Sequence, residues 1–379
     1  MDRKKVLLVS YYLYPYYNYG GGRRFISLID YYKNSKIDYL VITSSFKTFQ
    51  KEKILFIKDP FIKGKKVDRK ESFLRYFNPL PDSMFLWSFE VFKYIIKNKD
   101  DYERIIITSP PFSLPLILSL KLKKSDLDRF VLDVRDVYYN GTLREYKIIF
   151  IKFIDYIFDR IIFKKFDRIT TNIPQFVSLI KNRYKKRRVD LILNSFVEEK
   201  DKRGDLDFKG KFLLYAGKLD RYRFNKDFFE EFEKIYSKFG LNIFIVGKVE
   251  EKIKNYLEGK EYIKILGEMD YEKTSDYIFS SDIFLIMHPF DLKDGNSIFS
   301  SKLLDGIKFK KKILYVGPES EVFKFVKKYN IGETLNKSEI YNLEEKLKKL
   351  IERDYTYDEK VVEIFKQPYK NSYFTEGLF

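Results

Sequence analysis

The sequence predicts an α/β protein with two Rossmann-like domains, and two observations support this fold class. Short runs of β-branched and aromatic residues alternate with helical patterns, which is typical of parallel sheets covered by helices. A charged stretch without apolar periodicity interrupts the alternation once, near the middle of the chain. With 379 residues, the chain is long enough for two domains with separate hydrophobic cores.

The first predicted domain covers residues 1–197 and contains five clear strand patterns. They are Val6–Ser10, Tyr39–Thr43, Ile105–Thr108, Phe130–Leu132 and Arg168–Thr171. Helical patterns separate these runs, so we expect one parallel sheet.

Residues 198–210 are the predicted linker, because they are charged, lack periodicity and contain Gly204 and Gly210. The alternation then resumes with the strand patterns Phe212–Ala216, Asn242–Val246, Ile263–Leu266, Ile283–Met287 and Lys312–Val316. Helices such as Asp227–Phe239, Asp270–Ser280 and Leu343–Arg353 join them. The second domain therefore spans 211–354. Residues 355–379 form a C-terminal segment, and one of its expected arrangements is a return to the first domain.

The composition excludes several classes of site. The chain has no cysteine and one histidine, His288, which excludes disulfides, thiolate metal sites and His-rich metal sites. The pairs Asp126/Asp128 and Asp205/Asp207 lie in predicted surface turns and not at a metal site. We therefore expect no metal and no bound cofactor. Because no uncharged run is long enough for a membrane span and the N-terminus lacks a signal-peptide core, we expect a cytoplasmic protein.

Positive charge is concentrated in the first half of the chain. Residues 1–200 hold 40 Lys and Arg against 23 Asp and Glu, a net charge of +17, whereas residues 201–379 have a net charge of +1. We therefore expect the first domain to meet an anionic partner, such as a phospholipid surface, an acidic acceptor or nucleic acid.

In the second domain, glycine, hydroxyl and cationic residues follow predicted strands. Open parallel sheets bind ligands beyond the carboxyl ends of their strands. Gly217 and Lys218 follow one strand, where Lys218 with Arg221, Arg223 or Lys226 could bind a diphosphate. Ser300, Ser301, Lys302 and Asp305 lie around a predicted helix start, where free N–H groups and a lysine favour a phosphate and the carboxylate could accept from a sugar diol. An ordinary capped helix is the alternative interpretation.

The first domain has two comparable groups. Gly21 and Gly22 lie in a run of three glycines that frees the backbone for close approach, and Arg23 and Arg24 follow at a helix start. This run lies too far beyond the first strand for a dinucleotide fingerprint, which argues against a nicotinamide enzyme. In Asp133–Asp136, one aspartate is expected to pair with Arg135, which leaves the other, such as Asp136, to orient a substrate.

Two further segments of the first domain suit an anionic surface. Leu143–Ile169 predicts an amphipathic helix with Lys152, Asp155 and Asp159 opposite a broad apolar face. That face either packs on the core, which is the simpler interpretation, or lies on a membrane. The basic cluster that includes Lys185, Lys186, Arg187 and Arg188 predicts an exposed contact for lipid phosphates.

The order of these motifs resembles the retaining glycosyltransferases of glycosyltransferase family 4, which have the GT-B architecture, over almost the whole chain. The segments that carry the resemblance are Gly20–Arg24, Thr108–Pro111, Asp133–Asp136, Phe166–Thr171, Ala216–Leu219 and Ser301–Asp305.

The resemblance implies two domains facing across a cleft and the metal-independent transfer of a sugar from a nucleotide donor, with retention of configuration. It places Lys218 on the donor diphosphate, with Arg223, or alternatively Lys226, as the accompanying cation. Asp305 takes the position of a glutamate that binds the donor ribose, and Gly267 lies in the segment that contacts the base. Ser297 stands where the family has an earlier glutamate.

We therefore expect a cytoplasmic glycosyltransferase, peripheral at the inner face of the membrane, that builds a cell-surface glycan on a lipid-linked or anionic acceptor. Its partners would be the nucleotide-sugar donor, that acceptor and an anionic membrane, without nucleic acid. A nucleotide-sugar epimerase of the same fold is the closest alternative, and a non-catalytic protein that binds polyanions or nucleic acid is another.

Overall fold

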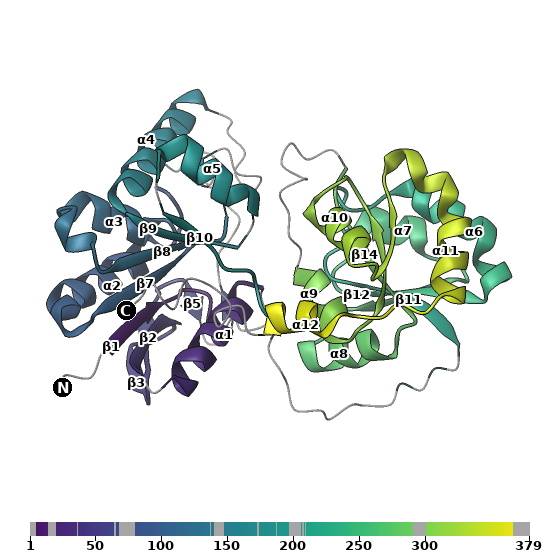
Figure 1. The fold of residues 1–379 in the computed structure, drawn as a ribbon, viewed down its shortest axis with the longest axis horizontal. Coiled ribbons are helices and arrows are strands. Elements are labelled where there is room, and N and C mark those ends of the chain that lie inside the picture. The colour runs from purple at the N-terminus through teal and green to yellow at the C-terminus, as the bar shows by residue number, and fades with distance from the viewer. Residues whose placement is uncertain are drawn as a thin grey trace. The chain divides into compact units, whose positions relative to one another are not determined.

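The computed structural model describes residues 5–13, 20–35, 37–63, 66–67, 80–136, 138–139, 148–172, 174–186, 188–196, 206, 208, 210–290 and 301–366. The chain divides between Val197 and Glu198 into two compact units, and the second extends through Lys366. Each unit is a parallel sheet with helices packed on it, as Figure 1 shows, so the predicted fold class of two Rossmann-like domains is confirmed.

The sheet of the first unit has eight strands in the order β10-β9-β8-β7-β1-β2-β4-β3. The strands are β1 (Lys5–Val9), β2 (Asp38–Ser45), β3 (Phe49–Lys51), β4 (Ile54–Lys58), β7 (Arg104–Ser109), β8 (Phe130–Val134), β9 (Arg168–Thr171) and β10 (Val189–Leu191). All neighbours pair in parallel except β3, which runs antiparallel to β4 at one edge. A separate ribbon pairs β5 (Ile62–Lys63) with β6 (Lys66–Val67).

Helices cover both faces of this sheet. They are α1 (Gly20–Asn34), α2 (Phe85–Asn98), α3 (Ser113–Lys121), α4 (Ile149–Lys165) and α5 (Pro174–Tyr184). Within β1, Val6 and Leu8 join the core around α1, whereas Leu7 and Val9 join the core beneath α2, α3 and α4. Because successive side chains of a strand point to opposite faces, a strand buried on both faces needs this continuous apolar run.

Helix α4 differs from its predicted orientation. Its ends are Ile149 and Lys165 rather than Leu143 and Ile169, and Asp155 and Asp159 point into the unit and are buried. Apolar residues of α4 lie outward instead, so the expectation that both aspartates lie on the solvent side is wrong. The physical reason is that tyrosines inside the unit satisfy the two carboxylates by hydrogen bonds.

The second unit has a six-stranded parallel sheet in the order β13-β12-β11-β14-β15-β16. Its strands are β11 (Lys211–Ala216), β12 (Leu241–Val246), β13 (Ile263–Gly267), β14 (Ile283–Met287), β15 (Lys312–Val316) and β16 (Gly332–Leu335). Its helices are α6 (Lys226–Phe239), α7 (Glu251–Leu257), α8 (Tyr271–Ser280), α9 (Ser301–Lys308), α10 (Glu321–Lys328), α11 (Leu343–Glu352) and α12 (Glu359–Lys366).

The C-terminal segment belongs in part to this second unit. Helix α12 lies within it and packs against α9, so the unit continues beyond Asp354, where the predicted domain ends. The expectation of a return to the first domain concerns residues 367–379, which lie outside the described residues. Of the helices that the structure describes, none combines the length and apolar composition that a membrane span needs.

Candidate functional site

The carboxyl edge of the second unit's sheet brings the predicted donor residues together. Chain order reverses between β11 and β14, which are neighbours in the sheet although two strands and three helices separate them in sequence. Parallel sheets bind ligands at such a switch point, beyond the carboxyl ends of the two strands. Gly217 and Lys218 follow β11, and His288 follows β14.

Glycines at the ends of β11 and β12 let two backbones approach each other and admit Lys302. Gly217 and Gly247 have φ values of 132° and 129°, which L side chains rarely adopt. A Cβ on Gly247 would lie 2.4 Å from the Gly217 carbonyl oxygen, and a Cβ on Gly217 would lie 2.7 Å from Cε of Lys302. A side chain at either position would therefore disturb the edge of the sheet where Lys302 lies.

Lys302 lies in the first turn of α9 and reaches the end of β11. Its Nζ donates to the hydroxyl of Tyr215 over 2.8 Å and lies 4.0 Å from the centroid of that ring. Burial, together with the positive charge of Arg223, lowers the pKa of Lys302 to about 7. A bound anion would favour the charged amine, so this lysine has the electrostatic character of an anion ligand.

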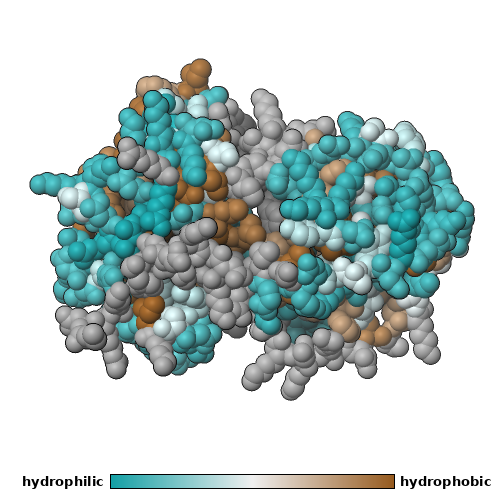
Figure 2. Space-filling view, in the orientation of Figure 1, coloured by the Kyte–Doolittle hydropathy of each residue, from teal (hydrophilic) through white to brown (hydrophobic). Residues whose placement is uncertain are grey.

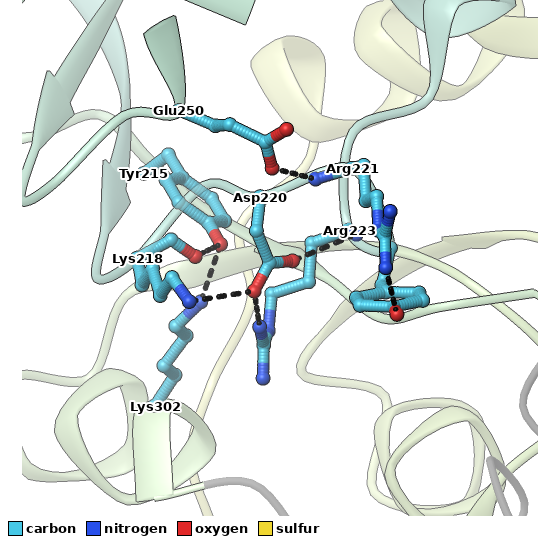
Figure 3. A network of polar contacts seen from close by, with 8 residues as sticks. Tyr215, Lys218, Asp220, Arg221, Arg223, Glu250 and Lys302 are labelled. Carbon is cyan, nitrogen blue, oxygen red and sulfur yellow. Dashed lines mark hydrogen bonds and ion pairs between the residues drawn. The ribbon is translucent and has the colours of Figure 1, made fainter. Parts of the chain in front are cut away.

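Asp220 organises the cations that follow β11, as Figure 3 shows. This buried carboxylate accepts from the Arg223 guanidinium at 2.6 Å, and Lys218 Nζ lies 3.5 Å from the same oxygen. The Tyr215 hydroxyl donates to the Lys218 carbonyl over 2.8 Å. Tyr215 thus links the Lys218 backbone to Lys302, and Asp220 links Lys218 to Arg223.

The structure distinguishes Arg223 from the alternative cations of this loop. Lys226 forms an ion pair with Glu230 one turn along α6, at 2.7 Å. The Arg221 guanidinium donates to the Tyr222 hydroxyl, and its backbone N–H donates to Glu250. Arg223 is the cation that shares Asp220 with Lys218, which supports its selection over Lys226.

Asp305 lies in α9, one turn beyond Lys302, and is buried. One of its carboxylate oxygens accepts from the Tyr271 hydroxyl of α8 over 2.9 Å. Tyr271 therefore fixes the orientation of the carboxylate predicted to bind a sugar diol. Gly267 ends β13 with φ of 76°, and its carbonyl accepts from the Gly247 N–H at 2.7 Å.

The remaining predicted donor residues are only partly described. Ser301 begins α9, but its side chain lies outside the described residues. Ser300 lies outside them entirely, and so does Ser297, the position at which the family has an earlier glutamate. The helix start expected in this segment is present at Ser301.

His288 lies beside these cations. Its Nδ1 is 3.2 Å from the Tyr315 hydroxyl, which also contacts Ser320. Its Nε2 is buried and has no hydrogen-bond partner among the residues that the structure describes. Burial and the nearby charges of Lys302 and Arg223 lower the pKa of His288 to about 3, so the imidazole is neutral at physiological pH.

Sequence reasoning missed Tyr215, Asp220 and Tyr271 as members of the site. Asp220 had a detectable signal, since it is an acidic residue between two cations just after a strand. The tyrosines had none, because in a chain with 31 tyrosines the residue type alone does not distinguish a hydrogen-bonding position.

In the first unit, Asp136 follows β8, at the carboxyl edge of that sheet. Burial raises the pKa of Asp136, and the charge of Arg135 acts in the opposite direction. The Arg135 guanidinium donates to the Pro110 carbonyl over 3.1 Å, while Asp133 accepts from Thr170 at 2.7 Å. Asp133 therefore supports the sheet, and Asp136 interacts electrostatically with Arg135, whereas we expected Arg135 to leave Asp136 unpaired.

The run of three glycines at 20–22 lies inside α1, which begins at Gly20, and not in a loop before it. The expectation of a glycine loop ahead of the helix is therefore wrong at this point. Gly21 and Gly22 belong to the first turn of α1. The side chains of Arg23 and Arg24 lie outside the described part.

The basic cluster is only partly exposed. Lys185 and Arg188 are exposed, and Arg188 pairs with Asp190 at 3.4 Å. The Lys186 side chain is 9% exposed, and its Nζ donates to the Lys164 carbonyl and to Asp167. The expectation that Lys186 is exposed is wrong, because these acceptors hold its amine inside the fold. Arg187 lies outside the described residues.

Within the described ranges, no group of three or more His, Asp or Glu side chains is arranged to hold a metal ion. The charged side chains of the candidate site are the cations Lys218, Arg223 and Lys302, together with Asp220 and Asp305. Such a set can bind a diphosphate and stabilise negative charge on it.

Neither a family model nor a curated protein matches this sequence. Solved structures do match it in fold over nearly the whole chain. The apo form of the lipopolysaccharide outer core galactosyltransferase WaaB has 15% identity and a TM-score of 0.60, with 99% of each chain covered.

Two complexes also match. Anabaena HepE with UDP and glucose has 12% identity and a TM-score of 0.56, covering 96% of this chain and 93% of its own. S. aureus MnaA with UDP has 12% identity and a TM-score of 0.53, covering 98% and 94%. At these identities the similarity establishes the fold, and the chain has the two-unit α/β fold of the GT-B type.

Proposed function

We propose that this protein is a glycosyltransferase that moves a sugar from a nucleotide-sugar donor to an acceptor hydroxyl. The observation that carries the proposal is the cationic site formed by Lys218, Arg223 and Lys302 at the switch point of the second unit. A diphosphate satisfies these cations better than a neutral ligand does, and Asp305 offers a carboxylate to the ribose. The UDP complexes of HepE and MnaA make a uridine nucleotide the first donor to test.

The finer mechanism that we propose is metal-independent transfer with retention of configuration. When the bond between the anomeric carbon and the diphosphate oxygen breaks, its electron pair leaves with the diphosphate. Lys218 and Arg223 would stabilise that added charge, which is the role a divalent cation has at metal-dependent sites where negative charge develops on phosphate oxygens. The acceptor hydroxyl forms the new bond to the anomeric carbon, and its proton passes to the oxygen of the departing diphosphate. Retention rests on the family resemblance of the sequence.

For the acceptor, we propose a lipid-linked or anionic glycan of the cell envelope, reached from the inner face of the membrane. The concentration of positive charge in residues 1–200 and the exposure of Lys185 and Arg188 support this choice. Asp136 would orient the acceptor or sugar from the first unit, and Arg23 and Arg24 would contact the acceptor.

A thermal-shift panel of nucleoside diphosphates and nucleotide sugars tests the donor site. A ligand at 100 times its Kd should stabilise the fold by about 2.7 kcal/mol. We expect a rise in Tm with one base, and with a diphosphate more than with the monophosphate. The absence of any shift across the panel would contradict the proposal.

An epimerase is the second candidate function, since a putative UDP-N-acetylglucosamine 2-epimerase from Listeria monocytogenes shares the fold. Incubation of a bound nucleotide sugar without acceptor separates the two activities. An epimerase would convert the sugar while it remains on the nucleotide, whereas a transferase would release free nucleoside diphosphate only slowly until an acceptor is added.

A further inference from the structure

The outward face of α4 is apolar, although this helix lies on the surface of the first unit. Phe150 is 64% exposed, Phe153 is 57% exposed, and Ile157 is also exposed. Their spacing of three and four residues places them in one row, and Ile161 and Lys164 continue the same row. Figure 2 shows hydrophobic residues at the surface of the part of this unit that carries α4.

The inward face of α4 fixes this orientation. Asp155 accepts from the Tyr138 hydroxyl over 2.7 Å, and Asp159 accepts from the Tyr184 hydroxyl. Rotating the helix to bury its aromatic row would break these bonds and leave tyrosine hydroxyls without partners, at a cost of about 1–3 kcal/mol each. The apolar row therefore stays outside in the folded unit.

A cationic hollow lies at the C-terminal end of the same row. It has a volume of about 610 Å³ and is lined by the cations Lys124, Lys164, Arg168, Lys185, Lys186 and Arg188. Asp167 is its acidic lining residue, and this carboxylate bridges Lys124 at 3.0 Å and Lys186 at 3.3 Å. The hollow thus has an excess of positive charge, which suits phosphate groups.

The two features are continuous along one helix. Lys164 is a member of the row and also lines the hollow, and it lies about 21 Å along the helix axis from Phe150. An apolar row that ends in a group of cations matches the two layers of an anionic bilayer, where acyl chains lie beneath phosphate headgroups. A nucleic acid would satisfy the cations but leave the phenylalanines exposed to water.

We propose that α4 and this hollow form a membrane-docking surface, in which the row from Phe150 to Ile157 inserts among acyl chains and the hollow binds lipid phosphates. The proposal deepens the membrane location given above and rests on the proposed function for the choice of a bilayer as partner. It assigns the contact to a helix face and to Lys164, beyond the basic cluster alone.

Sedimentation of the full-length protein with vesicles tests the proposal, using phosphatidylcholine vesicles with and without phosphatidylglycerol. We expect binding to the mixed vesicles, and a partition coefficient at least about tenfold lower for Phe150→Ser/Phe153→Ser. Tyr341→Ser, which changes an aromatic residue of the second unit that is 76% exposed, should bind as the wild type does.

A charge-matched pair of variants tests the hollow. Lys164→Glu/Lys185→Glu should lower binding to mixed vesicles at least about tenfold. Lys226→Glu/Lys234→Glu makes the same change of net charge on α6, at two exposed lysines, and should have little effect. Equal losses in both variants would show a general effect of net charge and would overturn the proposal.

Three other results would also overturn it. The first is undiminished vesicle binding by the phenylalanine variant. The second is a wild-type dimer in solution that becomes a monomer in this variant. The third is RNA binding that competes with vesicles and does not need the phenylalanines. Titration of the same variants with a nucleotide sugar keeps the two proposals separate. Unchanged donor binding with lost vesicle binding supports the docking surface. Lost donor binding with unchanged vesicle binding would place these side chains at the donor site and overturn the docking proposal.

Discussion

Helices α4 and α6 cover the sheets of the two units, yet their side chains are arranged in opposite ways. Helix α6 buries Phe228, Phe232 and Ile235 and places lysines and glutamates outward, as an amphipathic helix of a soluble protein does. Helix α4 buries two aspartates and places Phe150 and Phe153 outward. The packing of its own unit accounts for both faces of α6, whereas the proposed membrane contact accounts for the outer face of α4.

The cationic sites of the two units also differ, because they lie at opposite ends of the strands of their sheets. In the second unit, Lys302 and Arg223 converge on a small site at the carboxyl edge of the sheet. In the first unit, the hollow includes Arg168, which starts β9, and Arg188, which precedes β10, so it lies toward the amino ends of these strands. The difference agrees with the two anionic ligands that we propose, a compact diphosphate in the second unit and an extended membrane surface on the first.

The largest expected effect tests the contrast between the two helices. Phe232→Ala should lower the free energy of unfolding by about 3–5 kcal/mol, because it leaves a cavity in the core. Phe153→Ala should change it by less than about 0.5 kcal/mol, because that ring already faces solvent. Urea denaturation of both variants measures the difference. A large loss with Phe153→Ala would show that α4 is buried by its own unit.

The next effect concerns the glycine turn beside Lys302. Gly247→Ala should lower the free energy of unfolding by about 3 kcal/mol, since φ is 129° and the new Cβ would meet a carbonyl oxygen. Gly240→Ala is the matched control, because φ is 60° and the space around a Cβ is open, so we expect a loss of about 1 kcal/mol. Equal losses would mean that the close approach of the Gly217 and Gly247 backbones contributes nothing.

A third prediction separates the two cationic sites. Lys302→Met should weaken nucleotide-sugar binding by about 2 kcal/mol, roughly 30-fold, through loss of a charged hydrogen bond to the diphosphate. Its Tm should stay the same or rise, because a partly buried amine is replaced by an apolar chain of similar length. Calorimetric titration measures the affinity, with Lys226→Met as the control that should bind normally. Vesicle binding by Lys302→Met should be unchanged, and a loss there would contradict two separate sites.

The smallest effect is a pH dependence of donor affinity. The pKa of Lys302 is about 7 in the free protein, so its charged fraction, and with it the affinity, should fall about tenfold between pH 6 and pH 8. A nucleotide sugar is the suitable ligand, because free phosphate ends titrate near pH 6 themselves. His288 has a pKa of about 3 and should not contribute in this range. The Lys302→Met variant should lose the slope, and a slope that persists in it would assign the titration to another group.

Much of the fold could be predicted from the sequence. The strands buried on both faces, such as β1 and β14, have continuous apolar runs that leave little ambiguity. The short edge strands β3, β10 and β16 could not be predicted, because only three or four residues pair and charged or glycine residues occur within them.

The candidate site was predictable where charge follows a strand, as at Lys218 and Lys302. Contacts between residues that are far apart in the sequence could not be predicted, such as Tyr215 with Lys302 or Tyr271 with Asp305. The orientation of α4 was also beyond the sequence pattern. Its periodicity marks an apolar face, but the inward orientation of the aspartates depends on contacts with distant residues such as Tyr138 and Tyr184.

The most direct test of the central claim is a crystal structure of the protein with UDP. The account predicts the diphosphate at the carboxyl edge of the second unit's sheet, within hydrogen-bonding distance of Lys302 Nζ and the Arg223 guanidinium, with the ribose beside Asp305. Nucleotide bound elsewhere, or an unliganded edge at saturating UDP, would contradict the assignment of this edge as the donor site.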